Sequence, residues 1–452
     1  VHKAPQERVM AKDKKQKRTA RKATEKASEA RPVALPVVAL GASAGGLQAF
    51  SEFLDAMPDE SGMAFVLIHH VDPNHESLMA GLLAKHTNMP VALAVDGAEI
   101  APDHVYVIPP NQFLAVEDGK LRLSAPEARR GLRLPINFFM RSLARNHGQS
   151  AVAIILSGTG SDGTAALAEV KDQGGIVLVQ EPKEAAHDGM PRSAIAAGAV
   201  DHVLPVAEMP KVLLEYRNHP YINDAKNAQT LGDSALDALP EIISVLRAHS
   251  PLNFALYKEG TLLRRIERRM ILRHMVSAVD YLALLKDSPE EAENLSNDLL
   301  INVTQFFRDP DAFKYVSTDI LHDLVRKHDS GKPFRIWVPA CSTGEEAYSL
   351  AMATIEHISA LRKDIVLQVF ASDVDERSLS LARAGVYPET IEADVSAARL
   401  NRFFVKEDHS YRVTAELRGC VVFANQNVLA LSLIHISEPT RLVHSSRMPS
   451  SA

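Results

Sequence analysis

Short apolar runs alternate with helical patterns over residues 36–216. Buried strands are predicted at residues 37–40, 63–68, 151–156, 175–179 and 200–204. Amphipathic helices are predicted at residues 47–54, 76–84, 135–144 and from Thr164 onward. The apolar residues at 105–108 and 121–123 flank Asp118-Gly119, which is a hairpin signal. Because strands alternate with helices, the fold class predicted for this unit is α/β, with a doubly wound parallel sheet.

The pattern changes after residue 216. Residues 217–238 are polar, lack a strand pattern and are predicted to form a linker. Leu239, Ile242, Ile243 and Leu246 follow helical spacing, and more helices are predicted at residues 262–275, 281–285 and 295–303. A strand at 334–338, a helix at 347–355 and a second strand at 366–371 come next. The second half therefore predicts a small helical domain at 239–310, followed by a strand–helix–strand unit from residue 311.

Composition narrows the class of protein. A chain of 452 residues with 46% hydrophobic and 23% charged residues is ordinary for a globular protein of two or three domains. No run reaches the roughly 18 consecutive apolar residues of a membrane span, and the N-terminus lacks the apolar core of a signal peptide. Only Cys341 and Cys420 are present, which argues against a disulfide framework and a cysteine zinc site. We therefore expect a cytoplasmic protein without membrane insertion and without a bound metal.

Charge is unevenly distributed along the chain. Residues 1–31 carry eleven Lys/Arg and four Asp/Glu, a net of +7, so the remainder carries −6 − 7 = −13. Such a tail is able to touch nucleic acid or an acidic membrane. It has almost nothing to bury, however, so a disordered basic extension over residues 1–35, without a nucleic-acid partner, is the favoured interpretation.

The strand at 37–40 runs into the sequence Gly41-Ala42-Ser43-Ala44-Gly45-Gly46. A serine between a strand end and a helix start lies on a sharp turn, with its hydroxyl exposed and backbone N–H groups nearby. This is the arrangement of a nucleophile elbow, and residues 41–45 match G-x-S-x-G. The alternative is a glycine-rich phosphate loop, because helix N-termini attract anions.

Two other strand ends carry residues that complete a catalytic triad with Ser43. The strand at 63–68 ends in His69-His70, and the strand at 151–156 runs into a glycine-rich turn that contains Asp162. A serine nucleophile needs an imidazole to accept its proton and a carboxylate to orient the imidazole. The alternatives are histidines at the rim without a role, and an Asp162 that only caps the helix at Thr164.

The second half carries its own candidate chemistry. Only Gly344 is a glycine in the turn at 339–346, so G-x-G-x-x-G is not met and phosphate binding is unsupported. Asp373 ends the second strand, which is where a ribose diol is bound in Rossmann-like sites. A cofactor with a ribose and an ammonium fits better, with Glu345 paired to the ammonium. The alternative for Glu345 is an acidic residue that stabilises the helix N-terminus.

The predicted helix at 262–275 is strongly basic. Five arginines, at 264, 265, 268, 269 and 273, accompany the single acidic residue Glu267. A basic helix suggests an acidic partner, and the alternative is a solvated face.

Five stretches make the first unit similar to the catalytic domain of CheB chemotaxis methylesterases, over about residues 36–216. They are GASAGG at 41–46, IHH at 68–70, YVIPP at 106–110, LSGTGSDG at 156–163 and GMPR at 189–192. The resemblance implies a triad of Ser43, His70 and Asp162 that hydrolyses glutamate γ-methyl esters on chemoreceptors, without a cofactor; some members deamidate receptor glutamines. Ala44 stands where many members have threonine, and Thr159 where many have methionine beside the oxyanion. We expect this unit to act without the receiver domain that stand-alone members carry before it.

Residues 239–430 resemble CheR chemotaxis methyltransferases, which use S-adenosylmethionine. The stretches that carry the likeness are NVTQFFR at 302–308, STGEE at 342–346, ASD at 371–373 and NQNV at 425–428. The resemblance implies cofactor contacts from Asn302, Thr304, Arg308, Glu345, Asp373, Asn427 and Val428. It also implies that the basic helix at 264–273 faces the acidic methylation region of the receptor. The two halves together look like a CheB–CheR fusion, which acts on methyl-accepting chemoreceptors or related signalling proteins.

The methyltransferase pattern stops after the strand at 421–424 and the turn that follows it. From Leu431 the chain carries Pro439, Pro449 and six serines, and it resembles a translated sequencing adapter, so a foreign tail is predicted at 431–452. The S-adenosylmethionine domain is therefore expected to be truncated and inactive beside an active esterase. Two other functions stay open: a signalling adaptor without turnover, and a generic serine esterase of small molecules.

Overall fold

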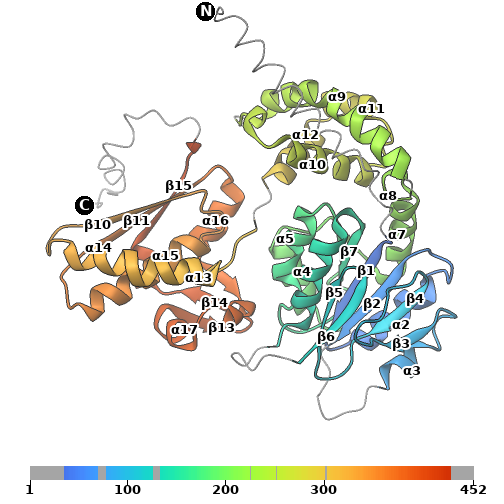
Figure 1. Ribbon diagram of the computed structural model, residues 1–452, viewed down its shortest axis with the longest axis horizontal. Coiled ribbons are helices and arrows are strands. Elements are labelled where there is room, and N and C mark those ends of the chain that lie inside the picture. The colour runs from blue at the N-terminus through green and yellow to red at the C-terminus, as the bar shows by residue number, and fades with distance from the viewer. Residues whose placement is uncertain are drawn as a thin grey trace, which may run out of the picture. The chain divides into compact units, whose positions relative to one another are not determined.

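A computed structural model describes residues 35–69, 78–125, 133–223, 225–250, 252–300 and 303–428. The first domain is built on a seven-stranded sheet with the order β3-β4-β2-β1-β7-β8-β9, in which all neighbouring strands are parallel (Figure 1). Its strands are β1 (Val37–Ala42), β2 (Ala64–His69), β3 (Val91–Leu93), β4 (His104–Val107), β7 (Ala151–Ile155), β8 (Ile176–Gln180) and β9 (His202–Leu204). The predicted α/β fold with a parallel, doubly wound sheet is confirmed.

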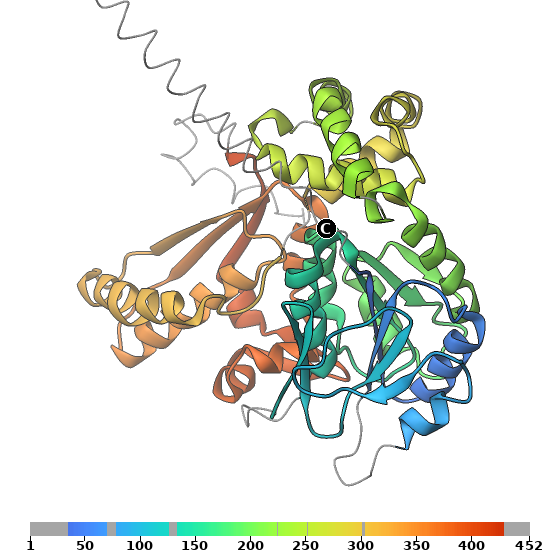
Figure 2. The same ribbon diagram turned by 45° about the vertical axis from the view of Figure 1, so that its right-hand side comes forward.

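The central strands form the core of this domain. Every residue of β1, β7 and β8 is buried, which explains why their sequences are continuous apolar runs rather than alternating ones. Helices α4 and α5 lie on one face of the sheet and α2 on the other (Figures 1 and 2). The helices are α2 (Gly46–Ala56), α3 (Met79–Leu83), α4 (Pro135–His147), α5 (Thr164–Asp172) and α6 (Gly189–Ala196), with short 3-10 turns η1 (Gly148–Ser150) and η2 (Val206–Glu208).

The predicted hairpin is correct in its turn and wrong in its partner strand. Asp118 and Gly119 have positive φ values of 50° and 74°, as a two-residue hairpin turn requires. The strands they join are β5 (Phe113–Glu117) and β6 (Lys120–Ser124). The apolar run at 105–108 instead lies in the parallel sheet as β4, because it is buried between β2 and β3.

Residues 211–296 form a compact helical unit of their own. The segment 217–238, predicted as a linker, is largely helical, since α7 (Met209–Asn218), α8 (Pro220–Asn223) and the 25-residue α9 (Ala225–His249) cover most of it. Its polar composition hid a few apolar residues, of which Tyr221, Ile222 and Ala235 are buried. The later elements are η3 (Phe254–Leu256), α10 (Glu259–Leu272), α11 (Ala278–Asp287) and α12 (Pro289–Leu299).

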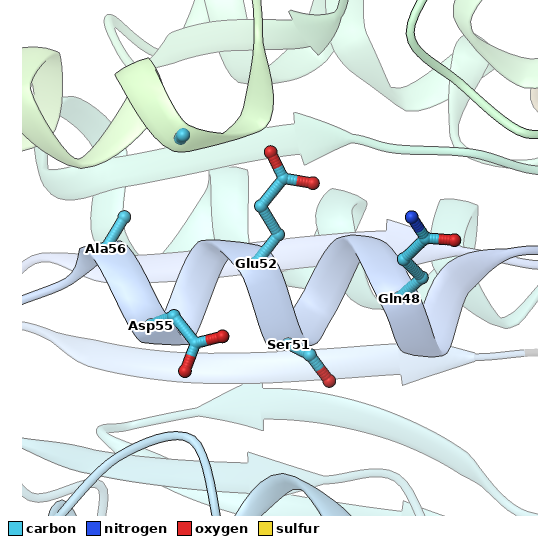
Figure 3. A pocket seen from close by; sticks show the side chains of 6 residues that line it. Gln48, Ser51, Glu52, Asp55 and Ala56 are labelled. Carbon is cyan, nitrogen blue, oxygen red and sulfur yellow. The ribbon is translucent and has the colours of Figure 1, made fainter.

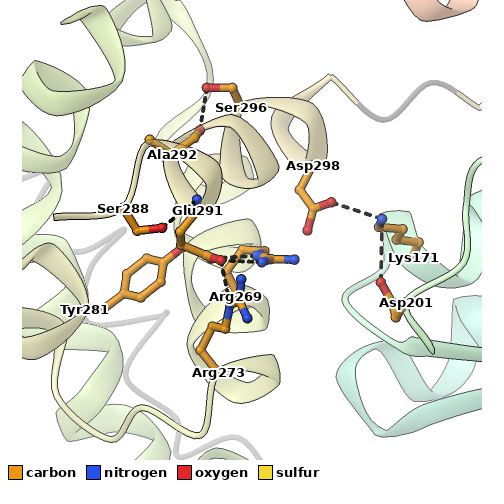
Figure 4. Close-up of polar contacts among 10 residues, drawn as sticks. All are labelled: Lys171, Asp201, Arg269, Arg273, Tyr281, Ser288, Glu291, Ala292, Ser296 and Asp298. Carbon is orange, nitrogen blue, oxygen red and sulfur yellow. Dashed lines mark hydrogen bonds and ion pairs between the residues drawn. The ribbon is translucent and has the colours of Figure 1, made fainter. Parts of the chain in front are cut away.

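The basic helix α10 turns several of its arginines inward. Arg265 and Arg268 are only 2% and 0% exposed. Arg269 donates two hydrogen bonds to the buried Glu291 carboxylate, at 2.9 and 2.6 Å, and Arg273 and the Tyr281 hydroxyl donate to it as well (Figure 4). The expectation of a single basic face toward an acidic partner is therefore wrong for these buried arginines, because a buried charge requires partners inside the domain.

The last domain has a three-stranded parallel sheet with the order β10-β11-β15 in the described residues. Its strands are β10 (Phe334–Pro339), β11 (Leu367–Asp373) and β15 (Val421–Asn425). A small antiparallel sheet, absent from the predictions, has the order β12-β14-β13: β12 (Val386–Pro388), β14 (Ser410–Val413) and β13 (Phe404–Glu407). The helices are α13 (Pro310–Tyr315), η4 (Val316–Leu321), α14 (His322–Lys327), α15 (Glu345–Ala360), α16 (Glu376–Ala384), η5 (Glu389–Ala393), α17 (Ala397–Phe403) and α18 (Ala415–Gly419). No helix in the described ranges has the length and apolar character to span a bilayer.

Candidate active site and cofactor site

The loop after β1 has the geometry of a nucleophile elbow. Ser43 follows the last residue of β1, and α2 begins three residues later at Gly46. Gly45 reverses the chain with a φ of 77°, a conformation that other residues adopt only with strain. A Cβ on Gly45 would also lie 2.6 Å from the Ser157 hydroxyl oxygen, so the turn needs a glycine for space as well as for φ. Ser43 is half-buried at the carboxyl end of the sheet.

Ser157, just after the neighbouring strand β7, holds this elbow in place by hydrogen bonds. Its backbone carbonyl accepts the Ser43 N–H at 3.0 Å, and its hydroxyl donates to the Ala44 carbonyl at 2.9 Å. The same hydroxyl oxygen accepts the His187 N–H at 3.0 Å. Ser157 is 1% exposed, so these partners satisfy its buried polar groups. Strand order reverses between β1 and β7, and the crevice at such a switch point is where open α/β sheets bind ligands.

Asp162 lies in the loop after β7 and is 5% exposed. One carboxylate oxygen accepts the Ile136 N–H at 2.9 Å, and the other accepts those of Asn137 and Gly163 at 3.0 and 2.8 Å. Asp162 therefore caps the N-terminus of α4, where the helix dipole favours a negative charge. The alternative for Asp162 was a cap on the helix at Thr164, but the side-chain acceptor found there is Asn137 Oδ1, which accepts the Ala166 N–H at 3.0 Å.

Only one of the two histidines predicted for this strand end belongs to the described residues. His70 lies outside the described residues. His69 is the last residue of β2, pairs with Ala42 of β1, and places its imidazole Nε2 2.8 Å from the Ser43 carbonyl oxygen. The strand ends that carry Ser43 and His69 are thus adjacent, and the loop with Asp162 follows β7 on the other side of β1.

This arrangement suits acyl transfer. The hydroxyl of Ser43 stands at a helix N-terminus, and Ala44 N–H has no acceptor among the residues that the structure describes. The amide that follows a nucleophile in an elbow is an oxyanion donor in α/β-hydrolases. A substrate carbonyl placed at Ser43 would therefore meet a nucleophile and a hydrogen-bond donor together.

A shallow hollow of about 420 Å³ lies along the outer side of α2, and it is not this site. Gln48, Ser51, Glu52, Asp55 and Ala56 line it together with Ala207 (Figure 3). Burial, helped by the nearby Glu184, raises the pKa of Glu52. Neither Ser43 nor Asp162 lines this hollow.

The second candidate site is the loop between β10 and α15. Ala340, Ser342 and Gly344 have positive φ values of 55°, 50° and 94°. Asp373, at the end of β11, accepts the Ser342 N–H at 2.7 Å and the Asp375 N–H at 3.0 Å. The carboxylate predicted to bind a ribose therefore also holds the loop that follows β10, and it keeps acceptor capacity for a diol.

Glu345 is the first residue of α15. Burial raises its pKa to about 7, although the Thr343 hydroxyl donates to it at 2.6 Å. Among the described residues it makes no ion pair. A carboxylate with a raised pKa and no cation beside it fits the ammonium group of S-adenosylmethionine, because a bound cation favours the ionised form of the carboxylate.

The other predicted cofactor residues lie in two further segments, before α13 and after β15, and Asn302 lies outside the described residues. Thr304 is half-buried, and Arg308 is exposed and donates to the Val303 carbonyl at 2.8 Å. Their segment is tied to α15, since the Phe307 N–H donates to the Ser349 hydroxyl at 3.1 Å. Asn427 and Val428 follow β15, beside the end of β11, because the Gln426 N–H donates to the Asp373 carbonyl at 2.9 Å.

Sequence reasoning missed the residues that hold these loops. Ser157 and His69 fasten the elbow, and the Tyr387 hydroxyl donates to the Thr343 carbonyl at 2.7 Å. Tyr387 comes from β12, a strand that was not predicted, so no signal pointed to it. Ser157 lay inside a recognised motif, and its small polar side chain directly after a buried strand was the available signal.

Three family models match the chain in succession. They are CheB methylesterase over residues 38–213, the all-alpha domain of CheR methyltransferase over 237–300, and its SAM-binding domain over 302–435. The matched ranges contain both candidate sites.

Curated relatives agree with these matches. An uncharacterized 104.1 kDa protein of Rhodobacter capsulatus is 39% identical over 78% of this chain and 39% of its own length. A protein-glutamate methylesterase/protein-glutamine glutaminase of Syntrophus aciditrophicus is 34% identical over 40% of this chain and 51% of its own. The chain thus spans about half or less of these two relatives. A putative enzyme of the same description from Leptospira interrogans is 31% identical over 39% of this chain and 92% of its own length.

Proposed function

This chain belongs to the CheB methylesterase family and continues into CheR methyltransferase domains, and from this premise we propose that residues 38–213 hydrolyse glutamate γ-methyl esters on chemoreceptors. The observation that carries the proposal is the elbow at Ser43, fastened by Ser157 and followed by a helix N-terminus. Its partners are methyl-accepting receptors, on which it acts in the cytoplasm.

The proposed reaction uses Ser43, His70 and Asp162. Ser43 Oγ attacks the ester carbonyl carbon and passes its proton to His70, which Asp162 orients. The proton is then delivered to the leaving oxygen, so methanol departs and an acyl-enzyme forms. Water, activated by the same histidine, releases the glutamate and restores Ser43. A receptor glutamine would follow the same route with ammonia as leaving group, in keeping with the glutaminase named in the relatives' descriptions.

For the CheR domains we propose that Glu345 and Asp373 hold the cofactor, with Thr304, Arg308, Asn427 and Val428 at its rim and Asn302 as a further contact. S-adenosylmethionine, when bound, supplies a methyl group to a receptor glutamate. Trp337 and Val422 are exposed, so the face of the described parallel sheet on which they lie is poorly covered. Because such a face leaves the cofactor cleft poorly supported, we expect weak cofactor binding and no detectable methyl transfer by this chain.

The test is methanol release from methylated receptor by the purified chain, with Ser43→Ala as the matched control. Methanol release that disappears in the variant supports the proposal. Receptor binding without methanol would indicate an adaptor, and hydrolysis of small esters without receptor hydrolysis would indicate a generic esterase. Transfer of radiolabelled methyl groups to receptor at a rate comparable to hydrolysis would contradict the expectation for the CheR domains.

A further inference from the structure

The His69 imidazole contacts the elbow, although His69 is not a member of the proposed triad. Its Nε2 lies 2.8 Å from the Ser43 carbonyl oxygen. A carbonyl oxygen only accepts, so Nε2 must carry the hydrogen and donate it. His69 therefore contacts Ser43 at its backbone carbonyl, and this carbonyl belongs to the peptide that joins Ser43 to Ala44.

The hydrogen bonds of the elbow show why this peptide matters. The Ser43 N–H donates to Ser157, and the Ala44 carbonyl accepts from the Ser157 hydroxyl. The Ser43 carbonyl accepts from both His69 Nε2 and the Gly46 N–H, the latter at 2.9 Å. Within the described residues this leaves the Ala44 N–H without an acceptor. In a trans peptide the carbonyl and the N–H point in opposite directions, so a donor that holds the Ser43 carbonyl also aims the Ala44 N–H.

Local packing fixes the ring in this position. A Cβ on Gly46 would lie 3.0 Å from His69 Cδ2, so the absence of a side chain there admits the imidazole beside the start of α2. The ring meets Phe50 of the same helix edge-on, with centroids 6.3 Å apart. His69 is thus held between β2 and α2 rather than free to rotate.

We propose that His69 is a positioning residue for the oxyanion donor: it orients and polarises the Ser43–Ala44 peptide, so that the Ala44 N–H meets the negative charge that develops on the substrate carbonyl oxygen. A hydrogen bond to a carbonyl strengthens the N–H of the same peptide as a donor. The proposal rests on the esterase function proposed above, and it assigns His69 no proton transfer with substrate.

The experiment compares His69→Ala with His69→Gln, because the glutamine side-chain amide is long enough to donate to the same carbonyl. Removal of an oxyanion donor costs about 10²–10³ in kcat, so loss of its positioning is expected to cost about 10- to 10²-fold. We expect His69→Ala to lower kcat for methyl ester hydrolysis by this factor with KM unchanged, and His69→Gln to restore most of it. His86→Ala is the control, since His86 contacts Asp55 on the surface of the same domain.

A second readout separates this proposal from the proposed substrate. Phosphonylation of Ser43 by a fluorophosphonate passes through an oxyanion-like transition state and needs no receptor, so its rate should follow the same order of variants. If receptor hydrolysis fails but Ser43 is labelled, and His69→Ala slows labelling, the positioning role stands and the receptor assignment falls. If His69→Ala matches the wild type, if glutamine gives no rescue although both variants melt like the wild type, or if Ser43 is never labelled, the positioning role is overturned.

Discussion

The two parallel sheets of this protein differ in how far their faces are buried. In the first domain β1, β7 and β8 are buried on both faces. In the last domain β10 alternates, with Phe334 and Val338 buried while Arg335 and Trp337 are exposed. Trp337 is 43% exposed and Val422 of β15 is 55% exposed, whereas the residues of the other face, such as Val369 and Ala371, are packed in the core.

Both candidate sites nevertheless lie at the carboxyl ends of parallel strands. In each, a strand runs into a loop of small residues, a helix begins within a few residues, and a carboxylate from the neighbouring strand's loop or end accepts backbone N–H groups. Asp162 does this for α4 and Asp373 for the loop at Ser342. The residues available for chemistry in each loop therefore follow from the strand end itself, while the support of the site depends on what covers the sheet.

The largest effect should come from Ser43. Ser43→Ala removes the nucleophile, and because triad members act as a unit we expect ester hydrolysis to fall by about 10⁶-fold. S-adenosylmethionine binding, measured by calorimetry, should not change, since it depends on the other sheet. Ser51→Ala, on the outer face of α2, is the matched control and should hydrolyse normally. His70→Ala should cost about as much as Ser43→Ala, and an equal loss in His69→Ala would undo the assignment of the base.

Asp162 should show both a rate effect and a stability effect. Asp162→Asn is expected to lower kcat by up to about 10⁴-fold if the carboxylate orients the imidazole. It should also lower the free energy of unfolding by about 1–2 kcal/mol, because both carboxylate oxygens accept buried N–H groups of α4 and the amide nitrogen of Asn cannot accept. Asp103→Asn is the control. Asp103 also accepts a backbone N–H, from Gly62 at 2.7 Å, but it directly precedes β4, at the amino ends of the strands. A variant of Asp162 that is destabilised but fully active would leave it only a cap.

Equal substitutions in the two sheets should have unequal costs. Val152 of β7 is 0% exposed and Val422 of β15 is 55% exposed. Val152→Ala should cost about 2 kcal/mol of unfolding free energy, and Val422→Ala less than about 0.5 kcal/mol. Urea titrations report on each sheet separately. Loss of ester hydrolysis reports the unfolding of the first sheet, and the fluorescence of the single tryptophan, Trp337, reports the unfolding of the second. Similar costs at both positions would show that the face with Val422 is covered in solution.

The smallest expected effect is a pH dependence at Glu345. Its folded-state pKa of about 7 lies above the usual value of 4.5, so the folded protein favours the protonated form and loses stability as pH rises from about 4.5 to 7. A bound cation needs the ionised form, so S-adenosylmethionine affinity should rise with pH, by at most about tenfold per unit, and level off above about pH 7. Glu345→Gln should bind weakly with a flat profile, and Glu346→Gln, at the exposed neighbour, should keep the wild-type slope. Calorimetry at several pH values measures this, and a wild-type affinity independent of pH would contradict the ammonium pairing.

Sequence patterns located most elements of both sheets to within a few residues. The strands at 37–40, 151–156 and 366–371 are confirmed as β1, β7 and β11, because continuous apolar runs between turn residues have few other places to lie. The failures share a cause. Residues 105–108 look the same in a hairpin and in a parallel sheet, residues 217–238 hide sparse apolar positions under polar ones, and the α10 arginines show charge but not the buried Glu291 that binds them.

Local sequence sets which residues form strands, where glycines permit sharp loops, and which serine and carboxylates lie at strand ends. These follow from steric limits on φ and from apolar periodicity, and both act over a few residues. Three features depend on the packing of distant segments: the N–H groups from which Asp162 accepts, the contacts of His69 and Ser157 with the elbow peptides, and the contact of Tyr387 with the loop after β10. These contacts join residues 26 to 113 positions apart, and strand order rather than local sequence sets their partners.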